Sequence, residues 1–328
     1  MTALYEVSKL SVDLLASGNG LCAQLIQRHL TINILQDIDI SIAAGEILGV
    51  VGESGSGKTT LARSMLGLQP VSGGTMCFDG REVASRTDFS NLRRNSAFMF
   101  QDPVASLSPR MKVGALVVEP LVIQRRPMAN AAEKAKELLE RVGLPASIAG
   151  RFPHELSGGQ ARRVCVARAL ALNPRLVIAD EPTAGLDVSV QGEILNLMTG
   201  LKKTLGLAFM IITHNLAMVR HVSDRIAILY LGRLMETGPT REVFARPAHP
   251  YTRSLIASEP QPDPRKRRVD LAIKGEIPSV LARPPGCAFH TRCTLAQQRC
   301  KEESPLPQSL PGGRTVRCHF PEQQPSTT

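Results

Sequence analysis

The sequence lacks a hydrophobic segment long enough to cross a membrane. Its longest apolar runs are residues 207–212 and residues 115–123, and Glu119 and Pro120 interrupt the second. A membrane-spanning helix needs roughly 20 apolar residues, so neither run qualifies. The first ten residues also lack the apolar stretch of a secretory signal peptide, because charged residues occur within them. We therefore expect the chain to function in the cytosol.

The seven cysteines cannot all pair, and an odd number argues against a disulfide framework in a cytosolic chain. Four of them gather near the C-terminus: Cys287, Cys293, Cys300 and Cys318. Their separations of five, six and seventeen residues fit structural zinc poorly, because zinc ligands usually come in more closely spaced pairs. This wider spacing permits an iron–sulfur cluster, whose charge Arg292 and Arg299 would offset. Four reduced cysteines in a small proline-rich fold are the alternative, and both interpretations stay open.

The net charge of +10 can indicate a nucleic-acid or membrane partner. The densest basic cluster, residues 265–268, lies between prolines and has no aromatic residues within it. This composition favours a solvated linker over a binding patch. The length of 328 residues suits a large domain followed by a small one. We predict a first domain at 1–258 and a linker with a small Cys/Pro-rich domain at 259–328.

A glycine-rich segment fits the pattern of a phosphate-binding loop, Gly-x-x-x-x-Gly-Lys-Thr. Its residues are Gly52, Glu53, Ser54, Gly55, Ser56, Gly57, Lys58, Thr59 and Thr60. Glycines let backbone N–H groups approach an anion, Lys58 adds a positive charge for the β- and γ-phosphates, and the Thr59 hydroxyl can reach Mg²⁺. A short apolar strand precedes the loop and a helix follows it, which places the helix N-terminus at the phosphates. A chance glycine-rich turn is the alternative.

Strands and helices alternate along most of the chain, which predicts an α/β fold with a mostly parallel sheet. Apolar strands are expected at 46–51, 176–179, 207–213 and 224–230. Helices are expected at 131–142, 161–172 and 190–205. The first of these lies within a mostly helical region from about 102 to 160, and the other two follow it. Residues 4–12 and 30–43 alternate apolar and polar positions and predict strands, whereas residues 14–29 between them are less regular.

Polar residues repeatedly follow the predicted strands, at the edge where such sheets bind ligands. Asp180 and Glu181 end one strand, and Gln101 and His214 end two others. An aspartate there can orient Mg²⁺, and the glutamate can act as a general base toward water. A strand-ending acid pair that caps a turn is the alternative. A second glycine turn, with Ser157, Gly158, Gly159 and Gln160, leads into another helix.

These motifs, in this order, resemble the ATPase cassette of ABC transporters from about residue 4 to 258, because Leu-Ser-Gly-Gly-Gln at 156–160 accompanies the phosphate loop. The resemblance implies a mostly parallel sheet core with an antiparallel β subdomain and a helical subdomain. It also implies bound ATP and Mg²⁺, with Thr59, Gln101 and Asp180 serving the metal ion. It implies that Glu181 polarises the attacking water and that His214 senses the γ-phosphate. Ser157, Gly158 and Gly159 would bind the nucleotide held by a second cassette, and Asp187 would lie in the loop that joins the two sites.

A narrower resemblance is to the ATP-binding subunits of dipeptide, oligopeptide and nickel importers. It rests on Phe-Gln-Asp-Pro at 100–103, on residues 106–110 and 187–191, on His-Pro-Tyr-Thr-Arg at 249–253 and on the cysteine-bearing tail. It implies two membrane permease subunits, a second ATPase subunit and an extracytoplasmic solute-binding protein as partners, with no nucleic acid. The location implied is peripheral, on the cytoplasmic face of the inner membrane. Peptide, nickel, opine and glutathione systems would look alike at this level.

The sequence departs from the family pattern at three places. Asn215 follows His214 where aspartate is usual, Ala-Gly stands at 184–185 where Ser-Ala is common, and Ala-Arg-Arg stands at 161–163 where Arg-Gln-Arg is usual. No aromatic residue occurs in 6–45 to stack on adenine; Tyr5 lies early for that role and His29 is a substitute.

The alternative function is a soluble ABC ATPase that acts on nucleic acid or ribosomes. The 55 residues between Gln101 and Ser157 leave no room for the long coiled coil of repair ATPases, and the chain holds one cassette where ribosome-acting relatives hold two. An exporter cassette is a third possibility, which the importer-like tail disfavours.

Overall fold

A computed structural model describes residues 3–15, 31–259 and 275–321. The basic cluster at 265–268, Cys22 and the candidate His29 lie outside these residues. The chain forms two compact units. The first comprises Met1–Leu4, Ile42–Leu48 and Val83–Thr213, and the second comprises Tyr5–Ser41, Gly49–Glu82 and His214–Thr328. Strand β3 (Ile47–Val51) contributes residues to both units.

The first unit contains three parallel strands. Strand β7 (Leu176–Asp180) pairs with β6 (Ser96–Met99) and with β8 (Ala208–Thr213), so that Leu176 lies opposite both Ser96 and Ala208. Every residue of β7 and β8 is buried. Continuous apolar runs of this kind are typical of parallel strands that are covered on both faces. The predicted parallel core is confirmed at these strands.

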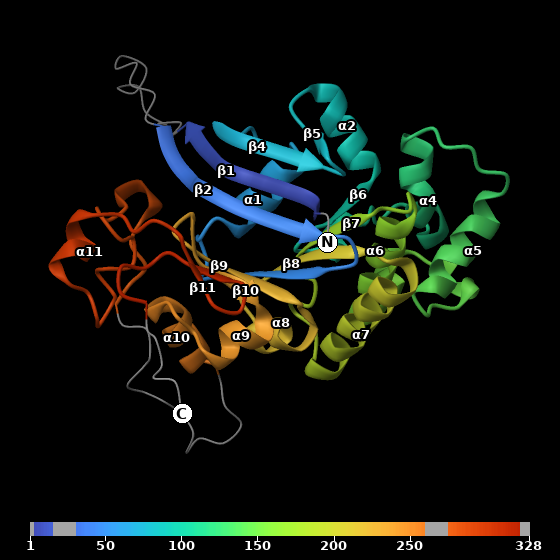
Figure 1. Cartoon of the computed structure of the whole chain (residues 1–328). Helices are drawn as coiled ribbons and strands as arrows, with labels where there is room; N and C mark the ends of the chain where they lie inside the picture. The colour runs from blue at the N-terminus through green and yellow to red at the C-terminus, as the bar shows by residue number, and fades with distance from the viewer. Residues whose placement is uncertain (1–2, 16–30, 260–274, 322–328) are drawn as a thin grey trace, which may run out of the picture. The chain divides into compact units, whose positions relative to one another are not determined.

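Helices make up most of the rest of the first unit, and Figure 1 shows α4 (Val113–Ile123), α5 (Ala131–Arg141) and α6 (Gly158–Leu170) grouped together. Helix α5 begins where the Asn130 side chain accepts hydrogen bonds from two backbone N–H groups. The other helical elements of this unit are α2 (Arg86–Arg94), α3 (Pro103–Ser106), α7 (Val188–Leu205) and the 3₁₀ turns η1 (Ala146–Gly150) and η2 (Pro153–Glu155).

The second unit contains an antiparallel sheet in the order β2 (Thr31–Ala43), β1 (Ala3–Leu15), β4 (Gly73–Phe78) and β5 (Arg81–Glu82). Figure 1 shows β2, β1 and β4 side by side. Tyr5 on β1 lies opposite Phe78 on β4, and their rings meet edge to face. The antiparallel β subdomain that the family resemblance implies is therefore present.

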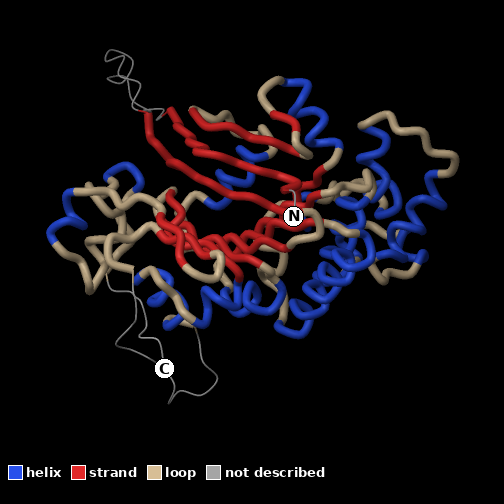
Figure 2. The backbone as a smooth tube through the Cα atoms, viewed as in Figure 1, coloured by secondary structure: helices blue, strands red, loops and turns tan. Residues whose placement is uncertain are grey.

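The C-terminal region also belongs to the second unit. Strands β9 (Arg225–Tyr230), β10 (Arg233–Pro239), β12 (Arg314–Val316) and β11 (Gln308–Leu310) pair antiparallel in that order. Figure 2 shows mostly loop backbone around the short helix α11 (Gln298–Glu302). The remaining helical elements are α1 (Lys58–Met65), α8 (Leu216–Val222), α9 (Thr240–Ala245), α10 (Pro250–Ala257) and η5 (Val280–Ala282).

A buried cluster holds this region on the unit: Tyr230, Tyr251, Phe289, Cys287 and Cys300 all belong to it. The sequence shows no clear period in this part of the chain, and the pairing of Glu236 on β10 with Val316 on β12 is a finding of the structure alone. The division at residue 258 remains a prediction. No described helix combines the length and the apolar character needed to cross a membrane.

Candidate nucleotide-binding site

The phosphate loop leads from β3 into α1, as the sequence predicts. Gly57 precedes the helix with φ of 103°, a left-handed conformation that favours glycine. A Cβ atom on Gly52 would lie 2.1 Å from the carbonyl oxygen of Leu229, so no side chain fits there. No side chain caps the N-terminus of α1, and its first turn carries no acidic residue. Backbone N–H groups and the positive end of the helix dipole therefore face the loop, an arrangement suited to phosphate.

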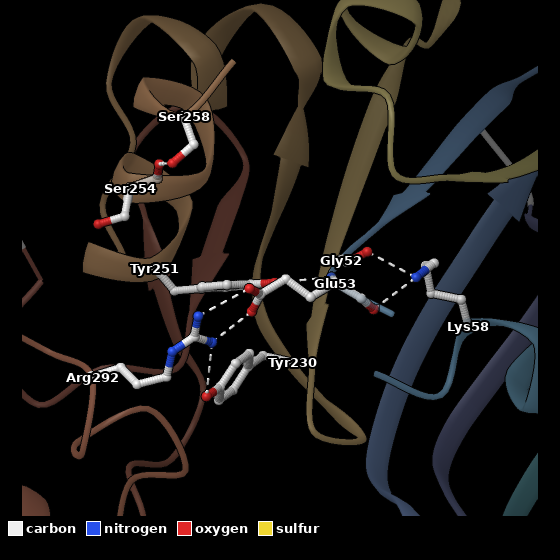
Figure 3. Close-up of polar contacts among 8 residues, drawn as sticks. All are labelled: Gly52, Glu53, Lys58, Tyr230, Tyr251, Ser254, Ser258 and Arg292. Carbon is white, nitrogen blue, oxygen red and sulfur yellow. Dashed lines mark hydrogen bonds and ion pairs between the residues drawn. The ribbon is translucent and has the colours of Figure 1, made fainter. Parts of the chain in front are cut away.

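Lys58 occupies the first position of α1, and Figure 3 shows its ammonium group directed at the start of the loop. Its Nζ atom donates hydrogen bonds to the backbone oxygens of Gly52 at 2.8 Å and Glu53 at 2.9 Å. The Lys58 side chain therefore lies against the loop that would bind the phosphates. A backbone hydrogen bond also holds the loop, because Gly232 N donates to Ser56 O at 2.9 Å.

The acid pair lies at the end of β7 in the first unit. Asp180 and Glu181 are both buried, and the Glu181 backbone takes a left-handed φ of 49°. Its N–H donates to Ile212 O at 2.8 Å, and one carboxylate oxygen accepts the Thr213 hydroxyl at 2.9 Å. The neighbouring strand β8 therefore orients the glutamate. The sequence motifs point to His214 at the end of this strand and not to its neighbour Thr213. The position of Thr213 at a strand end is the only sequence signal that could have identified it.

A buried arginine joins two loops of the first unit, one with Gln101 and the other with Glu181 and Ala184. The Arg162 guanidinium donates to the backbone oxygens of Gln101 and Glu181, each at 3.5 Å, and to that of Ala184. Arg162 is 4 % exposed, and burial lowers the pKa of its guanidinium. It is one of the residues at which the sequence departs from the family pattern. The departure places a rigid, multi-donor group behind the loops that carry Gln101 and Glu181.

The second glycine turn forms a capped helix start. Ser157 and Gln160 each bond the other's backbone N–H through their side chains, at 3.3 and 3.1 Å, as a capping box at the N-terminus of α6. Ser157, Gly158, Gly159, Gln160 and Asp187 line an open cavity of about 530 Å³ within the first unit. The structure therefore brings the second glycine turn and the loop of Asp187 together.

His214 lies in the second unit, exposed, one residue after β8. The next residue, Asn215, accepts a hydrogen bond from Met218 N at 3.0 Å and caps α8. Asparagine caps a helix as well as aspartate does, which explains why this departure from the family pattern leaves the local fold intact.

Tyr5 is excluded as an adenine platform. Its ring is fully buried, and its hydroxyl donates to the backbone oxygen of Met65. Burial raises the pKa of the phenol well above its ordinary value.

The four C-terminal cysteines line one cavity of about 20 Å³, together with His249, His290 and His319. Even so, no group of three or more His, Cys, Asp or Glu side chains among the described residues is arranged to hold a metal ion. Burial raises the pKa of Cys287 to about 11 and that of Cys318 to about 12, which favours neutral thiols. The residues in this arrangement do not fit an iron–sulfur cluster, and that prediction is unsupported.

The predicted residues thus fall into two sets. The phosphate loop and His214 belong to the second unit, whereas Gln101, Asp180, Glu181 and residues 157–160 belong to the first. Within each set the structure adds groups that the sequence motifs did not reveal. These are Thr213 and Arg162 in the first unit, and in the second unit Arg292 and Tyr251, which contact Glu53.

Comparisons with known proteins identify the family of this chain. Residues 35–184 match the family model described as ABC transporter, and residues 235–300 match the one described as oligopeptide/dipeptide transporter, C-terminal region. A "Probable peptide ABC transporter ATP-binding protein" of Sinorhizobium fredii is 44% identical over 294 residues, which cover 88% of this chain and 82% of that protein. A protein of Brucella ovis, named as a peptide import ATP-binding protein, is 43% identical over 307 residues, covering 93% of this chain and 97% of that protein.

Two solved structures resemble the fold. The cbiO1 protein of Clostridium perfringens, part of the ABC transporter complex cbiONQ, matches with a TM-score of 0.64 and 30% identity over 75% of this chain and 92% of that chain. The ATP-binding cassette MJ0796, solved as a dimer bound to ADP and phosphate, matches with a TM-score of 0.62 and 27% identity over 72% of this chain and 99% of that one.

The fold and the motifs define an ATP-binding cassette ATPase of the α/β class. More narrowly, the chain belongs to the ABC transporter ATP-binding proteins that carry the oligopeptide/dipeptide transporter C-terminal region. The matched families and the relatives named above are transport proteins, so nothing in them favours a nucleic-acid or ribosome function.

Proposed function

We propose that this chain is the ATP-hydrolysing subunit of an ABC importer for dipeptides or oligopeptides. The observation that carries the proposal is the match of residues 235–300 to the C-terminal region of oligopeptide/dipeptide transporters, on the same chain as the phosphate loop. The names of the Sinorhizobium and Brucella relatives support the same substrate class.

Each site residue has a role in this proposal. Lys58 turns from the backbone oxygens of Gly52 and Glu53 to the β- and γ-phosphates of ATP, and Glu181 accepts a proton from the attacking water. Thr59, Gln101 and Asp180 supply hydroxyl, amide and carboxylate oxygens, a donor set that fits Mg²⁺. When bound, Mg²⁺ would neutralise charge on the phosphates. His214 contacts the γ-phosphate.

The second glycine turn acts on another copy or a paralogous cassette. Ser157 and Gly158 are exposed at the cavity that Asp187 also lines, where a partner's nucleotide could be received. A single copy is therefore expected to bind ATP and to hydrolyse it slowly, so specific ATPase activity should rise with protein concentration. Constant specific activity from dilute monomer upward would contradict the two-cassette arrangement.

The membrane partners would dock on the first unit. An open, mostly apolar cavity of about 210 Å³ is lined by Phe98, Phe100 and Pro120 among others, and Phe100 directly precedes Gln101 in the chain. Phe100 is 50 % exposed, and Val122 and Ile123 at the end of α4 are more exposed still. A helix of a permease subunit would cover these apolar side chains. This contact would hold the chain at the cytoplasmic face of the inner membrane, with a solute-binding protein on the far side.

The first test addresses the chemistry. Glu181→Gln removes the proton acceptor and keeps the shape of the side chain, so ATP should still bind while turnover is lost. Wild-type turnover in this variant would refute the assignment of the base.

The second test addresses the solute. A strain that lacks this chain should lose uptake of labelled dipeptides and oligopeptides, and the wild-type chain should restore it while the Glu181→Gln variant should not. Unchanged peptide uptake in the deletion strain would refute the peptide assignment and leave the ATPase assignment standing.

A further inference from the structure

Glu53, inside the phosphate loop, is held by an arginine of the C-terminal region. Arg292 Nη1 lies 2.6 Å from one Glu53 carboxylate oxygen, and Nη2 lies 3.0 Å from the other (Figure 3). The Arg292 side chain is 5 % exposed and that of Glu53 is 20 % exposed. Two parallel N–H···O bonds to one carboxylate form a rigid contact that lysine cannot reproduce.

Aromatic residues hold this arginine in place. The Arg292 guanidinium carbon lies 5.7 Å from the centre of the Tyr230 ring, and Nη1 also lies 3.3 Å from the Tyr230 hydroxyl. Burial lowers the pKa of Arg292, but the hydrogen bonds to Glu53 and Tyr230 and the charge of Glu53 outweigh it, so the pKa is raised overall. The guanidinium is a fixed positive charge.

A second contact fixes the backbone of the same residue. Glu53 N donates to the Tyr251 hydroxyl at 3.2 Å, and Tyr251 packs against Tyr230 with ring centres 4.7 Å apart. The backbone oxygen of Glu53 accepts a hydrogen bond from Lys58 Nζ at 2.9 Å. Side chain, N–H and carbonyl of one loop residue are therefore all engaged, two of them by residues far along the chain.

An acidic side chain within a loop that binds a triphosphate needs an explanation. An unpaired carboxylate there would repel the phosphates, and little water would screen its charge because the Glu53 side chain is only 20 % exposed. We propose that Arg292 is a positioning residue of the phosphate loop, which neutralises Glu53 and fixes the loop in the shape that accepts ATP. The C-terminal region would then be a working part of the ATPase. This inference rests on the proposed binding of ATP at the loop and is independent of the transported solute.

The test compares nucleotide binding by full-length variants, measured by calorimetry with ATP and with ADP. Arg292→Gln should bind ATP about tenfold more weakly than the wild type, or worse, because an unscreened charge near the phosphates costs at least that much. The loss should be smaller for ADP, which carries less charge. Arg299→Gln is the matched control, since the Arg299–Glu303 pair is 60 % exposed on both sides and exposed pairs contribute little.

The double variant E53Q/R292Q separates positioning by charge from loss of structure. It removes the unpaired carboxylate, so ATP affinity should return to within about threefold of the wild type. Wild-type affinity in folded Arg292→Gln, or no recovery in the double variant, would overturn the inference.

Two further outcomes are separable. If Arg292→Gln does not fold, Arg292→Lys keeps the charge without the paired contact and should weaken ATP binding several-fold; wild-type affinity there would also overturn the inference. If the wild type itself binds no ATP, the proposed function fails, which is a different result.

Discussion

The Thr213 hydroxyl donates a hydrogen bond to the Glu181 carboxylate at 2.9 Å, with both residues buried in the first unit. The two side chains come from the ends of neighbouring parallel strands, β7 and β8. The contact holds one carboxylate oxygen and so limits the orientation of the proposed general base. Its removal is expected to affect the reaction more than the binding of ATP.

Thr213→Val keeps the shape of the side chain and removes the donor. A hydrogen bond to a charged group contributes about 1.5–3 kcal/mol, so kcat for ATP should fall about tenfold or more while KM changes little. Thr213→Ser, which keeps the hydroxyl, is the control and should retain most of the activity. Steady-state ATPase kinetics measure both values, and equal kcat in the valine variant would show that the contact is irrelevant to the base.

Arg162→Ala is predicted to uncouple the loops of Gln101 and Glu181. It leaves three backbone oxygens without their donor, one in a buried contact and two in partly buried contacts, so the free energy of unfolding should fall by about 2–3 kcal/mol. Urea denaturation measures this loss, and kcat should fall with it because Glu181 loses its support.

The neighbouring Arg163 offers a comparison for that experiment. Its ion pair with Glu193 is partly exposed, with a side-chain exposure of 60 % for the glutamate. Arg163 also donates a hydrogen bond to Val142 O at 2.8 Å, so Arg163→Ala should cost about 1 kcal/mol, less than Arg162→Ala. Equal losses of unfolding free energy in the two variants would mean that the buried position of Arg162 adds nothing to stability.

Gly159→Ala tests the packing of the second glycine turn. A Cβ atom on Gly159 would lie 2.9 Å from Val190 Cγ1, so the Val190 side chain or one of the helices α6 and α7 must shift. The clash should outweigh the better helix propensity of alanine and reduce the free energy of unfolding by about 1–2 kcal/mol. Gly200→Ala, within α7 and with open space around it, should instead stabilise by up to about 1 kcal/mol. Thermal or urea unfolding gives both signs, and a stabilised Gly159→Ala variant would contradict the crowding.

His249 is predicted to make the protein sensitive to acid. Burial lowers the pKa of its imidazole from 6.5 to about 3, and the ring nitrogen Nδ1 accepts a hydrogen bond from Tyr251 N at 2.9 Å. Because the unfolded chain binds a proton at this histidine below pH 6.5 and the folded chain does not, its contribution to stability is full above that pH. It is then lost by about 1.4 kcal/mol per pH unit as pH falls toward 3.

The variant His249→Asn checks this sign. Asparagine can still accept from Tyr251 N but does not titrate, so the slope due to His249 should disappear from unfolding curves measured between pH 7.5 and 5. Glu236, which accepts from His249 N, has a pKa raised by burial and therefore acts in the opposite sense over its own range. The difference between wild type and variant isolates the histidine, and parallel curves would show that it plays no part.

Features that depend on neighbouring residues could be predicted from the sequence. The phosphate loop, the apolar strands β7 and β8 and the capped helix start at Ser157 are local patterns, in which spacing alone specifies backbone and burial. The strands β11 and β12 could not be predicted. Each is three residues long; β12 pairs with β10, which lies far away along the chain, and β11 pairs with β12.

The cysteine cluster shows that residue spacing alone cannot predict a metal site. Spacing brought Cys287, Cys293, Cys300 and Cys318 to notice, and the structure does place them around one small cavity. Whether thiols can hold a metal depends on their mutual geometry and ionisation. Burial decides both, and burial is a property of the folded chain.

The sequence by itself determined the class of this protein, because nucleotide-binding motifs are short and their chemistry is carried by contiguous residues. Only the tertiary structure decided what supports those motifs. Thr213 meets Glu181 from 32 residues away, and Arg292 meets Glu53 from 239 residues away. Such contacts arise when strands and loops pack, and no pattern of neighbouring residues encodes them.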